Sequence, residues 1–108
     1  MKKDLYVWKL WNEAHLPEYG SEWAACFDLK ASLRDGDEVS IYTEANVKAK
    51  SLVKNKQFTL YGGQRALVPT GLVFDLDEGT VLRVHPRSGL SLKNGIVLAN
   101  AEGIVDAD

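Results

Sequence analysis

Three consecutive residues, Arg87, Ser88 and Gly89, combine groups that are suited to binding a phosphate chain. Arginine supplies a planar cation, serine a hydroxyl group, and glycine no side chain that would block close approach. Ser88 is also placed to act as the N-cap of a short helical turn at residues 89–93, which Gly95 can end in a left-handed conformation. We therefore predict a helical turn whose free backbone amides converge on an anion.

The residues that follow this turn predict a β-hairpin. A β-rich run at Ile96–Leu98, a turn at Asn100–Gly103 and a returning strand at Ile104–Asp106 have the composition of two strands and their connection. Polar side chains, Asn100 and Asp106, flank this connection. An amide can donate and accept hydrogen bonds at once, as recognition of a base edge requires, and a carboxylate can orient or deprotonate a water molecule.

These residues resemble a known family. The run Pro86–Leu90, followed by Lys93–Ile96 and then by Gly103–Asp108, is similar to the second motif and the opening of the third motif of the trimeric dUTP diphosphatases (dUTPases). An expected strand at Ala24–Leu29 resembles the first motif, although Cys26 stands where the family usually has glycine. The match ends within the third motif, so we expect the chain to be incomplete at its C-terminus and poorly active by itself.

The resemblance implies an enzyme that hydrolyses dUTP to dUMP and pyrophosphate with Mg²⁺, removing dUTP from the nucleotide pool and supplying dUMP. It also implies homotrimers whose active sites lie at subunit interfaces, with dUTP as the substrate. The residues that match functional positions of the family fall into four expected roles. Asp106 would be the catalytic residue that activates the attacking water, and Arg87, Ser88 and Gly89 would bind the phosphates. Asn100, Gly103 and Ile104 would bind the base and sugar, and Asp28 would contact the metal indirectly through water.

The residue types agree with this chemistry. Hydrolysis of a phosphoanhydride depends mainly on positioning and on stabilisation of charge, so one carboxylate, one arginine and a set of amides are sufficient. Mg²⁺ prefers six oxygen ligands, which a triphosphate and water can supply. We therefore do not expect a metal site built entirely from protein side chains.

Composition and strand spacing predict the fold class. The 108 residues are 45% hydrophobic, which suits one domain, residues 1–108, with a modest core. Short alternating runs recur every eight to twelve residues between turn signals, and no segment longer than two helical turns has helical periodicity. We predict an all-β protein, a distorted jelly roll or β-sandwich of short strands, with one helical turn near residues 89–93.

Charge and cysteine content limit the partners. Thirteen basic and 15 acidic residues give a net charge of −2, so we expect no nucleic acid and no membrane as a partner. The single cysteine, Cys26, excludes a disulfide within the chain. The first residues lack the apolar run of a secretory signal. We expect a cytoplasmic protein.

Two other functions remain open. The first is that of a dCTP deaminase, a sibling that shares the fold and trimer but typically has a second serine where Gly89 stands. The other is a non-catalytic β module. Compared with the family pattern, residues 43–57 look like an insertion with four lysines, which would form either a longer hairpin or, in this second case, a partner-binding arm along Lys48–Lys56.

Overall fold

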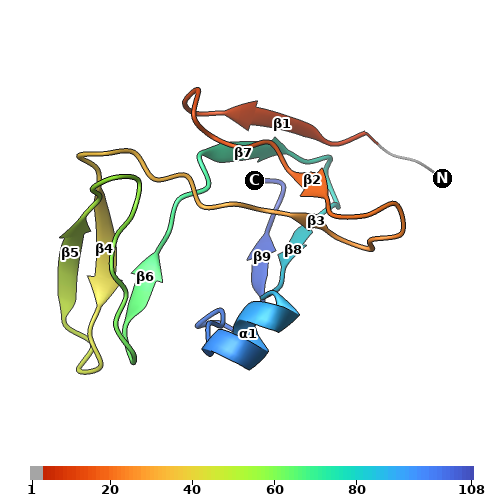
Figure 1. The fold of residues 1–108 in the computed structure, drawn as a ribbon. Helices are drawn as coiled ribbons and strands as arrows, with labels where there is room; N and C mark the ends of the chain where they lie inside the picture. The colour runs from red at the N-terminus through yellow and green to blue at the C-terminus, as the bar shows by residue number, and fades with distance from the viewer. Residues whose placement is uncertain (1–3) are drawn as a thin grey trace. The chain divides into compact units, whose positions relative to one another are not determined.

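Short strands make up most of the regular structure in residues 4–108, which are the residues described by the computed structural model (Figure 1). In this range they are joined by a single helix, which confirms an all-β protein with one short helical segment near residues 89–93. The elements are β1 (Tyr6–Lys9), β2 (Glu18–Tyr19), β3 (Phe27–Asp28), β4 (Glu38–Tyr42), β5 (Lys48–Leu52), β6 (Arg65–Leu67), β7 (Leu72–Asp75), β8 (Leu82–Val84), α1 (Ser88–Asn94) and β9 (Gly103–Val105).

The described chain divides into two compact units. The central unit holds residues 7–73, and the C-terminal unit holds residues 74–108 together with residues 4–6. The strands pair in the orders β1-β7, β2-β3, β5-β4-β6 and β8-β9. All of the sequence-predicted phosphate, base and catalytic residues belong to the C-terminal unit, whereas Asp28 belongs to the central unit.

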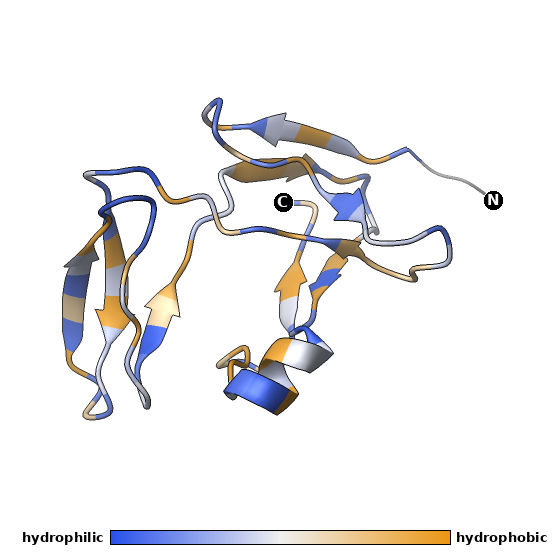
Figure 2. Cartoon of the chain, viewed as in Figure 1, coloured by the Kyte–Doolittle hydropathy of each residue, from blue (hydrophilic) through white to orange (hydrophobic). Residues whose placement is uncertain are grey.

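The core of the central unit lies on one face of the β5-β4-β6 sheet. Val39 and Ile41 alternate with polar residues along β4 (Figure 2). Residues two apart in a strand lie on the same face of the sheet, so we place both side chains on one face. They are 2% and 5% exposed and pack with Val53, which is 1% exposed and directly follows β5. Residues 48–52 form β5, which pairs with β4 as an antiparallel hairpin, and Val53 enters the core directly after this strand.

A second packed cluster surrounds Trp11. Its indole Nε1–H donates a hydrogen bond of 2.7 Å to Oγ of Ser32, which is a buried side chain. The guanidinium group of Arg34 lies 3.8 Å from the centroid of the indole ring, a cation–π distance. Gly71 packs against the same ring with a φ of +71°, and a Cβ added there would lie 2.8 Å from two ring atoms. A side chain at this position would therefore collide with the ring and also strain the backbone.

Replacing Gly71 by alanine is expected to lower the free energy of unfolding by about 3 kcal/mol, because the left-handed backbone and the overlap with Trp11 both oppose a Cβ. Urea unfolding, followed by tryptophan fluorescence, measures this change.

Gly36→Ala is the matched control. Gly36 has a φ of +90°, but a Cβ there would meet nothing within 4 Å. Only the strain of the left-handed backbone should therefore lower the free energy of unfolding, by about 1 kcal/mol. Equal losses in the two variants would show that the indole ring moves aside without cost.

Candidate functional site

The candidate site is organised around the antiparallel pair of β8 and β9. Leu82 lies opposite Val105, Arg83 opposite Ile104, and Val84 opposite Gly103. The predicted hairpin between Ile96–Leu98 and residues 104–106 is therefore wrong, since β9 pairs with β8 and residues 96–98 form no strand.

Local contacts explain this correction. The carbonyl oxygen of Ile96 accepts a hydrogen bond of 2.9 Å from Oγ–H of Ser91, and the Ile96 amide donates to the Leu90 carbonyl oxygen at 3.2 Å. Both backbone groups of Ile96 are thus engaged by α1, so they do not pair with a neighbouring strand.

Helix α1 begins after Pro86 and ends at a left-handed glycine. Gly95 has a φ of 67°, and its amide donates to the Ser91 carbonyl oxygen at 3.1 Å, which together with the Ile96 bond forms a Schellman motif. The predicted end of the turn is confirmed, but its beginning differs. Arg87, not Ser88, is the N-cap residue, because Arg87 has the extended backbone (φ −82°, ψ 134°) and Ser88 is already helical.

The N-terminal end of α1 leaves its functional groups available. No side-chain hydrogen bond caps the helix, so the hydroxyl of Ser88 is not used for capping. Arg87, Ser88 and Gly89 are all exposed. A Cβ built on Gly89 would meet nothing within 4 Å. The start of α1 therefore presents a cation, a hydroxyl group and space for a ligand to approach the backbone.

The predicted base-reading residues meet at a turn that leads into β9. We call residues 98–102 the Asn100 turn. The Ala101 amide donates to the Leu98 carbonyl oxygen at 3.0 Å, and the Glu102 amide donates to the Asn100 carbonyl oxygen at 2.7 Å. A Cβ on Gly103 would lie 3.8 Å from Nδ2 of Asn100 and 3.4 Å from Cβ of Val84. The side chain of Asn100 is thus close to the start of β9, next to Gly103 and Ile104.

Asp106 lies at the opposite end of the β8-β9 pair. It directly follows Val105, which is opposite Leu82, the first residue of β8. The chain enters α1 at the other end, after Val84, which is opposite Gly103. Three residues of a strand span about 10 Å, so the register alone carries Asp106 away from the end that leads to Arg87. Within one chain, the structure does not gather Asp106 and the phosphate-binding candidates at one end.

An ion pair between Arg83 and Glu102 links the Asn100 turn to β8. Nε of Arg83 donates to Oε1 of Glu102 at 2.5 Å, and its Nη2 donates to Oε2 at 3.1 Å. The hydrogen bond from Arg83 lowers the pKa of Glu102, with a further contribution from the charges of Arg83 and His85. The same hydrogen bond raises the pKa of Arg83. Both partners are therefore charged at neutral pH. The sequence interpretation missed this pair, because opposite charges 19 residues apart point to a contact only when the strand partner is known.

Asp28 lies in the central unit on β3, which is only two residues long, whereas a strand at Ala24–Leu29 was expected. Its register partner on β2 is Glu18, so two carboxylates occupy opposed positions, an arrangement that a cation or water would relieve. One oxygen of Asp28, Oδ2, would lie 3.5 Å from a Cβ on Gly20. Across residues 4–108 no three His, Cys, Asp or Glu side chains come together as a metal-binding group.

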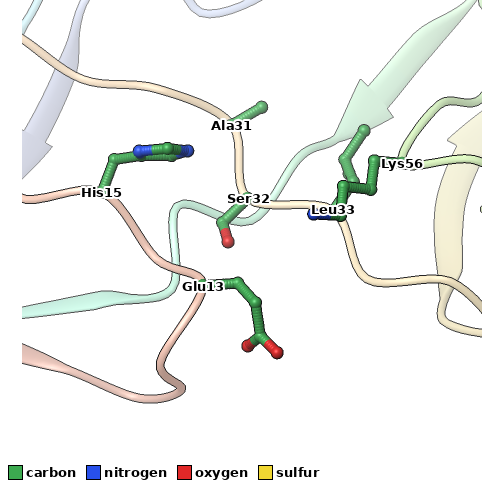
Figure 3. A pocket seen from close by; sticks show the side chains of 6 residues that line it. All are labelled: Glu13, His15, Ala31, Ser32, Leu33 and Lys56. Carbon is green, nitrogen blue, oxygen red and sulfur yellow. The ribbon is translucent and has the colours of Figure 1, made fainter.

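A surface hollow of about 290 Å³ in the central unit does not coincide with any of the predicted site residues (Figure 3). The hydroxyl oxygen of Ser32 on its wall already accepts the Trp11 hydrogen bond. The residues that line the hollow are Glu13, His15, Ala31, Ser32, Leu33 and Lys56. We therefore place the candidate site on the C-terminal unit and not in this hollow.

In residues 4–108 no helix has both the length and the apolar composition that are needed to cross a membrane.

A comparison with known protein families covers the second half of the chain. Residues 51–108 match the family model for dUTPase, and this stretch contains β8, α1, the Asn100 turn and β9. The matched segment therefore includes the candidate phosphate, base and catalytic residues.

Curated relatives carry the name deoxyuridine 5'-triphosphate nucleotidohydrolase. One from Bartonella bacilliformis is 41% identical over 93 residues, which is 86% of this chain and 42% of the relative. One from Rhizobium johnstonii is 42% identical over 86% of this chain and 47% of the relative, and one from Chlamydia pneumoniae is 38% identical over 86% and 50%. The chain thus spans about half the length of the curated relatives it matches. The dUTPase model matches more than half of the chain, which establishes that this chain belongs to the dUTPase family.

Proposed function

We propose that this chain is a dUTP diphosphatase, which hydrolyses dUTP to dUMP and pyrophosphate. The observation that carries the proposal is the set of functional groups at the start of α1. Arg87 and Ser88 are exposed, and the helix does not use the Ser88 hydroxyl as a cap. The names of the relatives, which specify a deoxyuridine triphosphate as the substrate, support the same conclusion.

In the proposed reaction, the carboxylate of Asp106 orients a water molecule and accepts its proton as the water oxygen attacks the α-phosphorus in line. The bond between the α-phosphorus and the bridging oxygen breaks, and pyrophosphate leaves with that oxygen. Arg87 and the hydroxyl of Ser88 bind phosphate oxygens and stabilise the charge of the transition state. The open space at Gly89 lets a phosphate approach the backbone.

The base is read by the Asn100 turn and the first residues of β9. The amide of Asn100 can donate and accept at the same time, as pairing with the edge of uracil requires. The backbone around Gly103 and Ile104 supplies a fixed pattern of donors and acceptors, so a base with a different pattern would leave polar groups unpaired. This mismatch is the proposed basis for discrimination against cytosine.

A Mg²⁺ ion in the proposed site would be held mainly by the substrate, because Mg²⁺ takes oxygen ligands from phosphates and water. Asp28, whose register partner Glu18 is also acidic, would accept hydrogen bonds from water around the ion. When bound, Mg²⁺ would neutralise part of the triphosphate charge.

A complete site requires more than one copy of the chain. The register of β8 and β9 puts Asp106 and the entry to α1 at opposite ends of the pair. A homotrimer, in which Asp106 of one copy meets Arg87 of the next, would bring the two together, and cyclic symmetry would produce identical sites at each interface.

Release of pyrophosphate from dUTP, measured beside dCTP and UTP, tests the proposed function. With Mg²⁺ present we expect release from dUTP only, at the low rate expected of this chain by itself. Ammonia release from dCTP would instead indicate the deaminase, and the absence of both reactions together with no thermal stabilisation by dUMP or dCMP would favour a non-catalytic module.

Replacing Gly89 by alanine is expected to raise the KM for dUTP about tenfold while the free energy of unfolding stays equal or rises by about 0.5 kcal/mol. The added Cβ meets no atom of the chain within 4 Å, so any loss must come from the ligand. Gly62→Ala, at another glycine where a Cβ meets nothing, is the control and should leave both quantities unchanged. An unchanged KM in Gly89→Ala would exclude close approach of a phosphate at this position.

Mixing two inactive variants tests whether the sites are shared. Arg87→Ala and Asp106→Asn should each abolish dUTP hydrolysis. After the two are unfolded and refolded together in equal amounts, random assembly should restore roughly a quarter of the wild-type rate, because that fraction of interfaces receives both intact residues.

Each variant refolded alone is the control and should remain inactive. Mixed oligomers without activity would mean that both residues of a site come from the same copy. This result would contradict the proposed homotrimer, in which Asp106 and Arg87 of one site belong to different copies.

A further inference from the structure

The ion pair between Arg83 and Glu102 is built differently from the other ion pairs on the surface of the described residues. Arg83 lies opposite Ile104, and Glu102 is two residues before Ile104, so the two charged side chains are diagonal neighbours on one face of the β8-β9 pair. The guanidinium group makes two hydrogen bonds to the two carboxylate oxygens, at 2.5 Å and 3.1 Å. Such a two-point contact fixes direction as well as distance.

The Arg83–Glu102 pair contacts the Asn100 turn, which lies outside the β8-β9 ladder. The β8-β9 ladder begins only at Val84 and Gly103, so the Asn100 turn lies beyond its last backbone pairing. Within the turn, Ala101 has a φ of 63°, a left-handed conformation that strains a residue with a side chain. The two backbone hydrogen bonds of the turn are internal to it, whereas the contact of Glu102 with Arg83 ties the turn to β8.

Stability alone is a poor explanation for this contact. Exposed ion pairs contribute little to the free energy of folding, and the Arg83 side chain is 63% exposed. The side chain of Glu102 is only 30% exposed, however, and its residue is next to Gly103 and two residues from Asn100. The contact therefore fixes the orientation of the residues that precede β9.

We propose that Arg83 and Glu102 are positioning residues that hold the Asn100 turn in the orientation in which it reads the base. This inference rests on the proposed function, because the turn needs a fixed orientation only if it recognises a nucleotide. The role differs from that proposed for Arg87, because the side chains of Arg83 and Glu102 are engaged with each other.

The test compares Glu102→Gln and Arg83→Gln with the wild type in dUTP hydrolysis. Each variant should raise the KM for dUTP about fivefold with kcat within about twofold, because binding of the base weakens while Asp106 and Arg87 are intact. The preference for dUTP over dCTP, measured as the inhibition constant of dCTP relative to the KM for dUTP, should fall. Arg83→Glu combined with Glu102→Arg restores opposite charges and should recover at least half of the lost kcat/KM.

Glu38→Gln is the matched control. It removes one carboxylate from the exposed pair between Lys50 and Glu38, whose 3.3 Å contact lies in the central unit, and should change neither KM nor base preference. Hydrogen exchange at the amides of Ala101 and Gly103 gives a readout without substrate, and it should quicken in Glu102→Gln but not in Glu38→Gln.

Two results separate the failure of this inference from the failure of the proposed function. An active wild type with an unchanged KM in Glu102→Gln would overturn the positioning role and leave the hydrolase assignment intact. A wild type that binds and hydrolyses no dUTP would overturn the assignment, and the base-reading role would fall with it.

Discussion

The register of β8 against β9 is the constraint on which the candidate site depends. It sets Gly103 opposite Val84 at one end and Val105 opposite Leu82 at the other. The first end carries the Asn100 turn and leads into α1, and the second delivers Asp106. A shift by one residue would turn every side chain of β9 to the other face, so Arg83 would lose its diagonal neighbour. Three residue pairs thus place the groups that we propose to bind phosphate, to read the base and to activate water.

Local signals in the sequence predicted several features that depend on neighbouring residues. Gly95 ends α1 in the left-handed conformation that the Asn94-Gly95 dipeptide indicated. Leu72 and Phe74 are better buried than Val73 and Asp75, so burial alternates along β7 as it does in the short alternating runs that predict strands. The N-cap was displaced by one residue, because Arg87 keeps the extended backbone. Caps and alternation depend on a few neighbouring residues, which is why sequence reasoning finds them.

Long-range pairing was the part that the sequence could not supply. Ile96–Leu98 and β9 are close in sequence and rich in β-formers, which favours a hairpin. The Schellman motif instead engages the backbone of Ile96, and β8 becomes the partner of β9. The identities of Arg87 and Asp106 were available from the motif, but their separation along the β8-β9 pair required the register. The ion pair of Arg83 and Glu102 was hidden for the same reason.

The strand contributed by residues 48–52 has two rows of side chains that face different constraints. Ala49 and Ser51 oppose the core residues Ile41 and Val39, whereas Lys48 and Lys50 oppose Tyr42 and Ser40 on the outer face. Ser51 is partly buried opposite Val39, whereas Lys48, Ala49 and Lys50 are exposed. The electrostatic character of this sheet can therefore drift during evolution without disturbing how the interior is filled.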